Sequence, residues 1–239
     1  MAVGRPAGYR GRVTGPRCDC CYDEAFDDRH AAEKLRAFRR DGPGRATRVL
    51  ANALAVGGVE GRTILDIGAG LGGLHHLLLA AGAASAVDVD ASRPYLDAAR
   101  AEASRLGLAE RVTFRHGDFV AIAAEVPQAD LVGLDRVVCC YPDPASLVRS
   151  AADHTRRRLG IVLPPDGRIA GLVVGIFNLG QWLRRDPFRI YAHPHAVVRS
   201  AATAAGLVPA GIERVGLWRL LLFDRPVLTA AAGPAPLAS

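Results

Sequence analysis

The chain has 239 residues, half of them hydrophobic, which is enough for one sizeable core with at most one inserted cap. Charged residues make up an ordinary 23% of the sequence, and no apolar run reaches the roughly 20 residues of a spanning helix, which excludes a membrane span. The net charge of +6 raises the question of a nucleic-acid partner.

The excess positive charge gathers at one end of the chain. Arg5, Arg10, Arg12 and Arg17 supply four of the six excess charges, and no acid lies among the first seventeen residues. This segment is rich in Gly and Pro and lacks the apolar core of a secretory signal, so we predict a disordered basic tail over residues 1–17. With no secretion signal, the five cysteines are expected in a reducing cytoplasm without structural disulfides.

Two helices are predicted after the tail. Residues 28–40 and 46–56 have helical patterns, and Asp41-Gly-Pro-Gly44 breaks the chain between them. We expect residues 18–60 to form a helical lead-in or lid.

Beyond residue 61, short apolar strand patterns alternate with helical ones. The strands are predicted at 63–67, 84–89, 112–116, 131–134 and 159–163, and the helices at 71–81, 93–106 and 144–155. This alternation predicts a parallel sheet covered by helices on both faces.

The last quarter of the chain has a different pattern. Residues 167–185 are apolar on most sides, and residues 194–205 form a further helix. Val208–Val215 and Leu217–Phe223 read as two strands whose tight connection at Gly216 requires antiparallel pairing.

The predicted fold is therefore α/β and Rossmann-like, with a seven-stranded, mostly parallel sheet, helices on both faces and an antiparallel C-terminal strand. The main domain is expected over residues 61–226, with a flexible tail over 227–239. Within the domain, residues 167–192 are expected to be an apolar helix and connection that caps an acceptor or forms a homodimer contact.

A glycine-rich motif, Asp66-Ile-Gly68-Ala-Gly70-Leu-Gly72-Gly73, lies between a predicted strand and helix. Its glycines allow a sharp turn and the close approach of a ligand to the backbone. Gly68, Gly70 and Gly73 also satisfy the dinucleotide pattern G-x-G-x-x-G, so an NAD(P)-dependent oxidoreductase is one alternative. The carboxylate of Asp66 argues against it, because a dinucleotide loop must receive an anionic pyrophosphate.

Two further acidic motifs follow the next strands. The second strand ends in Asp88-Val-Asp90-Ala-Ser92, and Gly117-Asp118-Phe119 follows the third. With these motifs and the glycine loop, the stretch from roughly residue 63 to 119 resembles the core of class I S-adenosylmethionine-dependent methyltransferases.

The resemblance implies S-adenosyl-L-methionine as cofactor and S-adenosyl-L-homocysteine as product. It implies that Asp66 meets the cationic amino-acid end of the cofactor, while Asp90, or alternatively Asp88, binds both ribose hydroxyls. Asp118 would accept a hydrogen bond from the adenine amine, and Phe119 would cover the ring. The other cofactor contacts expected are Gly68, Gly70, Gly72, Ala91, Asp135 and Tyr22.

In this family, the segment after the fourth strand faces the transferred methyl group. Here it reads Asp135-Arg136-Val-Val-Cys139-Cys140-Tyr141-Pro142-Asp143. The Asp/Asn-Pro-Pro-Tyr/Phe tetrad of DNA adenine and protein-glutamine methyltransferases is absent from this segment. The pair Pro164-Pro165 cannot take its place, because it follows the fifth strand and not the fourth. We therefore expect a small-molecule acceptor and no nucleic acid. The acceptor-binding candidates are Arg136, Cys139, Cys140, Tyr141 and His193, and the catalytic candidates are Asp135, Tyr141 and His193.

Two features of this acceptor side leave alternatives open. His193 precedes a helix and suits either a general base for an acceptor hydroxyl or a packing and capping role. Three cysteines before the first helix, Cys18, Cys20 and Cys21, would complete a thiolate cluster with Cys139 and Cys140. Their spacing matches no standard zinc pattern, so no metal is predicted.

Outside the core, the layout resembles small-molecule methyltransferases, including magnesium-protoporphyrin O-methyltransferases. The shared features are the lead-in at Tyr22–Phe26, a proline after the fifth strand, and an apolar helix before the last helix and hairpin. The resemblance implies methylation of a small molecule in secondary or cofactor metabolism, and the Arg- and Ala-rich composition favours a high-GC bacterial source. A non-catalytic binding module with the same fold is the second alternative.

Overall fold

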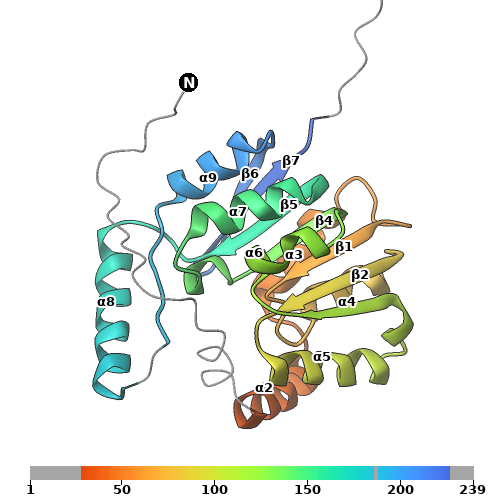
Figure 1. Cartoon of the computed structure of the whole chain (residues 1–239), viewed down its shortest axis with the longest axis horizontal. Helices are drawn as coiled ribbons and strands as arrows, with labels where there is room; N and C mark the ends of the chain where they lie inside the picture. Colours follow the sequence, from red (N-terminus) through yellow and green to blue (C-terminus); the bar gives the residue numbers. More distant parts are fainter. Residues whose placement is uncertain (1–27, 186–187, 227–239) are drawn as a thin grey trace, which may run out of the picture.

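A computed structural model describes residues 28–185 and 188–226 of the chain (Figure 1). Its strands form a single seven-stranded sheet in the order β3-β2-β1-β4-β5-β7-β6. The pairs from β3 to β5 are parallel, and β7 is antiparallel to both β5 and β6. The predicted fold class is thus confirmed.

The strands lie close to their predicted positions. Their bounds are β1 Thr63–Ile67, β2 Ser85–Asp90, β3 Val112–His116, β4 Ala129–Asp135, β5 Thr155–Leu163, β6 Val208–Val215 and β7 Trp218–Asp224. The fifth strand begins four residues earlier than its apolar pattern indicated. Arginines extend it, because Arg158 forms an ion pair with Asp224 on the neighbouring strand at 2.6 Å.

Eight α-helices are described around the sheet. They are α2 Asp28–Asp41, α3 Arg45–Ala55, α4 Gly73–Ala80, α5 Arg93–Arg105, α6 Phe119–Ile122, α7 Pro144–Asp153, α8 Arg168–Leu183 and α9 His195–Ala204. The short α6 is the only one without a counterpart in the sequence prediction. Its four residues are too few to produce a helical repeat in the apolar pattern.

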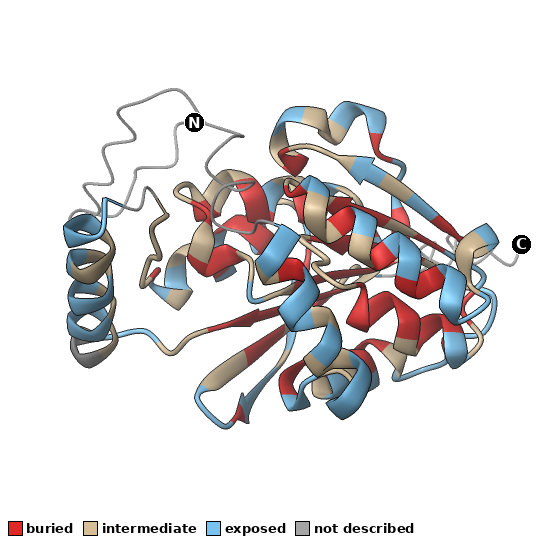
Figure 2. Cartoon of the chain, turned by 90° about the horizontal axis from the view of Figure 1, so that it is seen from below, coloured by how far each residue is buried: buried red, intermediate tan, exposed pale blue. Residues whose placement is uncertain are grey.

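Two apolar cores lie on the two faces of the sheet. Helices α3, α4 and α5 pack with one set of strand residues, and α6, α7 and α9 pack with the alternate set. The neighbours Ile64 and Leu65 belong to different cores, as the alternation of side chains along a strand requires. Figure 2 shows these buried residues as the central layer of the molecule.

Helix α8 stands apart from this layered body (Figures 1 and 2). It makes no extensive contact with any other described helix or strand. Among the described residues, no helix is long and apolar enough to cross a membrane.

Candidate functional site

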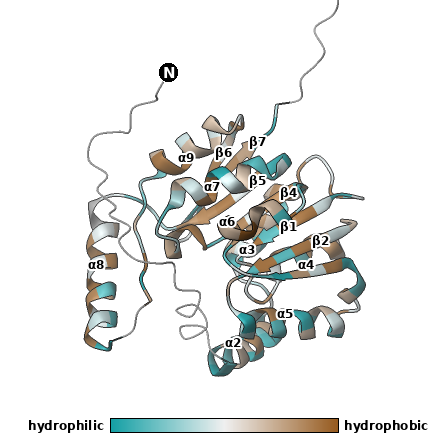
Figure 3. Cartoon of the chain, in the orientation of Figure 1, coloured by the Kyte–Doolittle hydropathy of each residue, from teal (hydrophilic) through white to brown (hydrophobic). Residues whose placement is uncertain are grey.

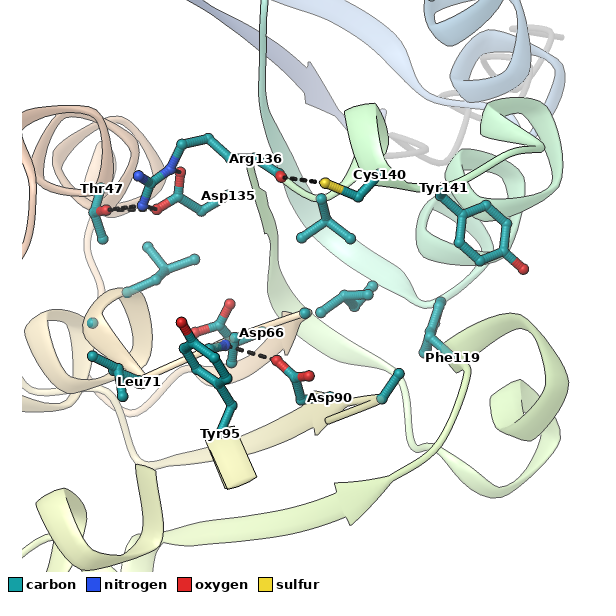
Figure 4. Close-up of a pocket in the computed structure, with 18 of the residues that line it drawn as sticks. Thr47, Asp66, Leu71, Asp90, Tyr95, Phe119, Asp135, Arg136, Cys140 and Tyr141 are labelled. Atoms are coloured by element: carbon teal, nitrogen blue, oxygen red, sulfur yellow. Dashed lines mark hydrogen bonds and ion pairs between the residues drawn. The ribbon is translucent and has the colours of Figure 1, made fainter. Parts of the chain in front are cut away.

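A cavity of about 470 Å³ opens at the carboxyl ends of the parallel strands. It lies where the chain order of the sheet reverses between β1 and β4, the point at which open α/β sheets bind ligands. Its volume lies within the range of small-molecule and cofactor sites. Figure 4 shows side chains of several strands and helices converging on it.

The glycine loop between β1 and α4 forms one wall of the cavity. Gly68, Gly70 and Gly72 have φ angles of +64°, +56° and +77°, a conformation that side chains disfavour. Gly68 and Gly70 line the cavity with bare backbone. Gly72 does not line it; an added Cβ there would lie 2.5 Å from the His75 ring, so this glycine makes room for a buried histidine.

Asp66 lies at the end of β1, beneath this loop, and is 1% exposed. Its Oδ2 accepts the His75 backbone N–H at 3.3 Å and lies 2.9 Å from His75 Nδ1. Its Oδ1 is buried and meets no donor in the part of the chain that the structure describes. The residue borders the cavity, so it offers an unsatisfied anionic acceptor there.

Of the two acids on β2, only Asp90 lines the cavity. Its Oδ2 accepts the Gly70 N–H at 2.8 Å, and its Oδ1 accepts the Ser92 N–H at 2.9 Å. Burial raises the pKa of this carboxyl above its ordinary value. Asp88 is fully buried and pairs in register with Asp66. The geometry therefore favours Asp90 over Asp88 as the ligand-facing acid.

On the opposite wall, Asp118 and Phe119 follow β3, and Ala91 lies between them and the glycine loop. Asp118 caps α6 by accepting the Val120 N–H at 2.9 Å. The hydroxyl of Tyr141 donates to the same carboxylate, 3.0 and 3.1 Å from its two oxygens. In Figure 4 the Tyr141 hydroxyl points away from Asp135. Its hydrogen bonds to Asp118 support a positioning role and give no support to the predicted catalytic one.

Asp135 and Arg136 form a third wall at the end of β4. The Arg136 guanidinium donates two hydrogen bonds to the Asp135 carboxylate, at 2.9 and 3.0 Å. The Thr47 hydroxyl donates to the same carboxylate at 2.5 Å. Arg136 has a φ of +64°, which is uncommon for a residue with a side chain and is typical of functional sites.

The two described cysteines follow on a short 3₁₀ turn, Val138–Cys140. Their sulfurs lie 3.8 Å apart, and the Cys139 thiol donates to the Arg136 carbonyl at 3.3 Å. Cys140 lines the cavity, whereas Cys139 is buried behind it, so only one of the pair lies where both were expected. The hydrogen bond from Cys140 lowers the pKa of Cys139.

Four residues that the sequence assigned to the site lie outside the described ranges. They are Tyr22, predicted as a cofactor contact, and Cys18, Cys20 and Cys21, considered for a thiolate cluster. Within those ranges, no group of three or more His, Cys, Asp or Glu side chains is arranged to hold a metal ion.

His193 is buried and does not line the cavity. Its Nε2 faces the Tyr141 carbonyl oxygen at 2.9 Å, and its ring stacks on Tyr191 with centroids 5.4 Å apart. Burial lowers the pKa of this imidazole. The position favours the packing role and gives no support to the general-base assignment.

Several lining residues were not among the predicted ones. They include Lys34 and Phe38 of α2, Thr47 of α3, Tyr95 of α5 and Trp218 of β7. Burial raises the pKa of Tyr95 to about 12, so its hydroxyl remains protonated at neutral pH. Of these, only Lys34 stands out in the sequence, because it is the one lysine in the chain. Nothing in the sequence distinguishes the others from residues with a purely structural role.

The residues present fit S-adenosylmethionine. Gly68 and Gly70 present bare backbone to the cavity; an added Cβ at Gly68 would lie 2.5 Å from the Val137 side chain. The Oδ1 of Asp66 is an unsatisfied acceptor suited to a cation. Asp90 and Asp118 add two carboxylates from the ends of neighbouring strands, at positions suited to a ribose and an adenine.

Comparisons with known proteins agree with this geometry. Residues 64–158 match a family model described as a methyltransferase domain. The magnesium protoporphyrin IX methyltransferase of Synechocystis PCC 6803, with bound S-adenosylhomocysteine, is similar at a TM-score of 0.66 and 22% identity, over 87% of this chain and 99% of that one. An O-methyltransferase family protein from Burkholderia thailandensis is similar at a TM-score of 0.66 and 21% identity, over 87% of this chain and 65% of that one. A search of curated proteins found no match.

Proposed function

We propose that this chain is a class I S-adenosylmethionine-dependent methyltransferase and that it methylates a small-molecule acceptor. One observation carries the proposal. The cavity that brings together Asp66, Gly70, Asp90 and Asp118 also includes Cys140 and Arg136 from the segment after β4. A single cavity therefore offers a cofactor wall and an acceptor wall.

Each acid of the cofactor wall would have its own role when the cofactor is bound. Asp66 would face the cationic amino-acid end with its unsatisfied oxygen, and His75 holds the other oxygen in place. Asp90 would face the ribose hydroxyls while it holds the glycine loop through the Gly70 N–H. Asp118 would face the adenine amine.

When bound, S-adenosylmethionine supplies an electrophilic methyl carbon, to which the acceptor heteroatom bonds as the carbon–sulfur bond breaks and S-adenosylhomocysteine is left. The chain contributes alignment and exclusion of water. Phe38, Leu71 and Trp218 provide apolar lining for that purpose.

The acceptor wall favours nucleophiles that need little help from a base. The carboxylate of Asp135 is occupied by Arg136 and Thr47, and Asp118 is occupied by Tyr141. His193 lies outside the lining. We therefore favour an amine, a thiol or an acidic hydroxyl as the acceptor group, whose own proton leaves to solvent.

A small molecule is favoured over nucleic acid on two grounds. The tetrad that holds a planar base amine is absent after β4. Four of the six excess charges lie in residues 1–17, so the charge of the rest of the chain is nearly balanced. The similarity to a porphyrin methyltransferase agrees with a small, apolar acceptor in bacterial secondary or cofactor metabolism, and we place the reaction in the cytoplasm.

The test uses the full chain and S-adenosylmethionine labelled in the methyl group. The protein is incubated with small-molecule acceptor libraries grouped by nucleophile and, separately, with tRNA, DNA and protein extracts. Label in a small-molecule fraction, lost in a Gly70→Val variant, is expected. Label found only in the nucleic-acid or protein fraction would contradict the small-molecule assignment. Tight cofactor binding without transfer to any acceptor would instead indicate a binding module.

A further inference from the structure

Helix α8 exposes large apolar side chains with no partner in the described chain. Figure 3 shows the helix as a largely hydrophobic element at the margin of the molecule. The residues concerned are Leu172, Val173, Ile176, Phe177, Leu179, Trp182 and Leu183, which are between 42% and 69% exposed. Apolar exposure of this extent on one isolated helix marks an interaction surface.

One face of α8, which we call the inner face, contacts the rest of the chain. Val174, Asn178 and Gln181 are half-buried and lie on one side of the helix. Asn178 anchors that side through two hydrogen bonds with the Ile190 backbone, at 2.8 and 3.0 Å. The opposite side therefore points away from the rest of the chain.

Four residues form a narrow row on that opposite side, which we call the outer stripe: Leu172, Ile176, Leu179 and Leu183. Their spacing of four, three and four residues is that of a coiled-coil seam. The order of these spacings is the same from either end of the helix. When two copies of α8 lie antiparallel, Leu172 therefore faces Leu183 of the other copy, and Ile176 faces Leu179.

We propose that the outer stripe joins two copies of this chain through antiparallel pairing of their α8 helices. A two-fold interface requires a self-complementary surface, which the symmetric stripe provides. The outer stripe and its flanking neighbours Val173 and Trp182 present on the order of 700 Å² per chain, close to what each partner contributes to a stable interface. A 16-residue helix is marginal in water by itself, so pairing also stabilises α8.

A membrane surface is the competing occupant, and the sequence of α8 disfavours it. Interfacial membrane helices carry lysines or arginines along a polar face. Helix α8 has no charged residue between Arg168 and Arg184, and its polar residues Asn178 and Gln181 lie on the inner side. This composition suits contact with another apolar helix.

Sedimentation velocity of the full chain tests the proposal. Wild type is expected to be a dimer, and Ile176→Glu/Leu179→Glu a monomer. Phe177→Glu is the matched control, because Phe177 is 42% exposed on the same helix but lies about a third of a turn from the outer stripe. Since α8 contributes no residue to the cavity, all variants should keep the wild-type affinity for S-adenosylhomocysteine, which shows that they fold.

Charge pairing tests the antiparallel register. Ile176→Glu mixed with Leu179→Lys should form a heterodimer, because the two substituted positions face each other. Ile176→Glu mixed with Ile176→Lys should not, because each charge then faces an apolar residue. The reverse result would overturn the antiparallel arrangement.

Two further results would overturn the proposal itself. One is a wild-type monomer, including one that binds vesicles of anionic phospholipid through the outer stripe. The other is a dimer that persists in Ile176→Glu/Leu179→Glu.

Discussion

At the scale of single residues, Asp88 and Asp90 show how far a motif can locate a ligand-binding acid. They are two positions apart on β2, so their side chains point to the same face of the sheet. Asp90 is the last residue of the strand and reaches the cavity, whereas Asp88 lies beneath it, buried beside Asp66. Sequence alone left both candidates open, because the end of a strand is not fixed to within two residues.

We predict that Asp90→Ala weakens binding of S-adenosylhomocysteine by roughly two to four orders of magnitude, because both ribose hydroxyls lose their acceptor. The carboxylate supplies charged hydrogen bonds worth about 1.5–3 kcal/mol each. Its loss also frees the N–H of Gly70, which it holds at 2.8 Å. Isothermal titration calorimetry measures the change. Asp88→Asn is the control and should keep its affinity within a few-fold; an effect on Asp88→Asn alone would move the assignment to that residue.

For Tyr141, the structure replaces a predicted catalytic role with a positioning one. The hydroxyl donates to Asp118, so Tyr141→Phe should raise the KM for S-adenosylmethionine by about tenfold while kcat changes little. Tyr191→Phe is the matched control, because that ring stacks on His193 outside the cavity. A fall in kcat with an unchanged KM would restore the catalytic interpretation.

At the scale of elements, the patterns that repeat over several residues could be predicted. Strands β1 and β3 have the predicted bounds, and the helix expected over 93–106 is α5, capped by Ser92. What could not be predicted comes from tertiary contacts. Helix α2 brings Lys34 and Phe38 to the cavity, and β7 brings Trp218, although each lies far in sequence from the glycine motif.

The glycine loop yields a prediction at this scale. Gly70→Val should abolish S-adenosylhomocysteine binding, because the side chain would fill cavity space and resist a φ of +56°. Gly107→Val separates the two causes. Gly107 has a φ of +71° and open space around its Cα, and it lies outside the cavity, so this variant should lose stability alone. Equal binding by both variants would show that the loop does not hold the cofactor.

At the scale of the whole molecule, the α/β alternation and the final hairpin were enough to predict the layered sheet. The sequence did not reveal the buried polar cluster between the glycine loop and α4. There His75, His76, Asp66 and Asp88 all contain buried atoms without a hydrogen-bond partner in the described chain. Two of these residues, His76 and Asp88, couple the stability of the domain to pH.

Two of these groups act in opposite directions. Burial lowers the pKa of His76 from 6.5 to about 3, with the charge of His75 adding to the effect. Between these pH values His76 binds a proton in the unfolded chain but not in the folded chain, so the free energy of unfolding falls as pH drops from 6.5 toward 3. Burial raises the pKa of Asp88 well above 3.8, with Asp66 adding to it. The folded chain keeps that proton, so stability falls as pH rises above 3.8.

Between about pH 4 and 6.5 the two slopes oppose each other, each up to about 1.4 kcal/mol per pH unit. We predict that Asp88→Asn, which leaves His76 alone, gains stability as pH rises through this range. His76→Leu, which leaves Asp88 alone, should lose stability over the same range, and the double variant should depend on pH less than either single variant. Urea unfolding at several pH values measures each free energy of unfolding. Parallel pH profiles for wild type and both single variants would show that neither group titrates differently in the folded chain.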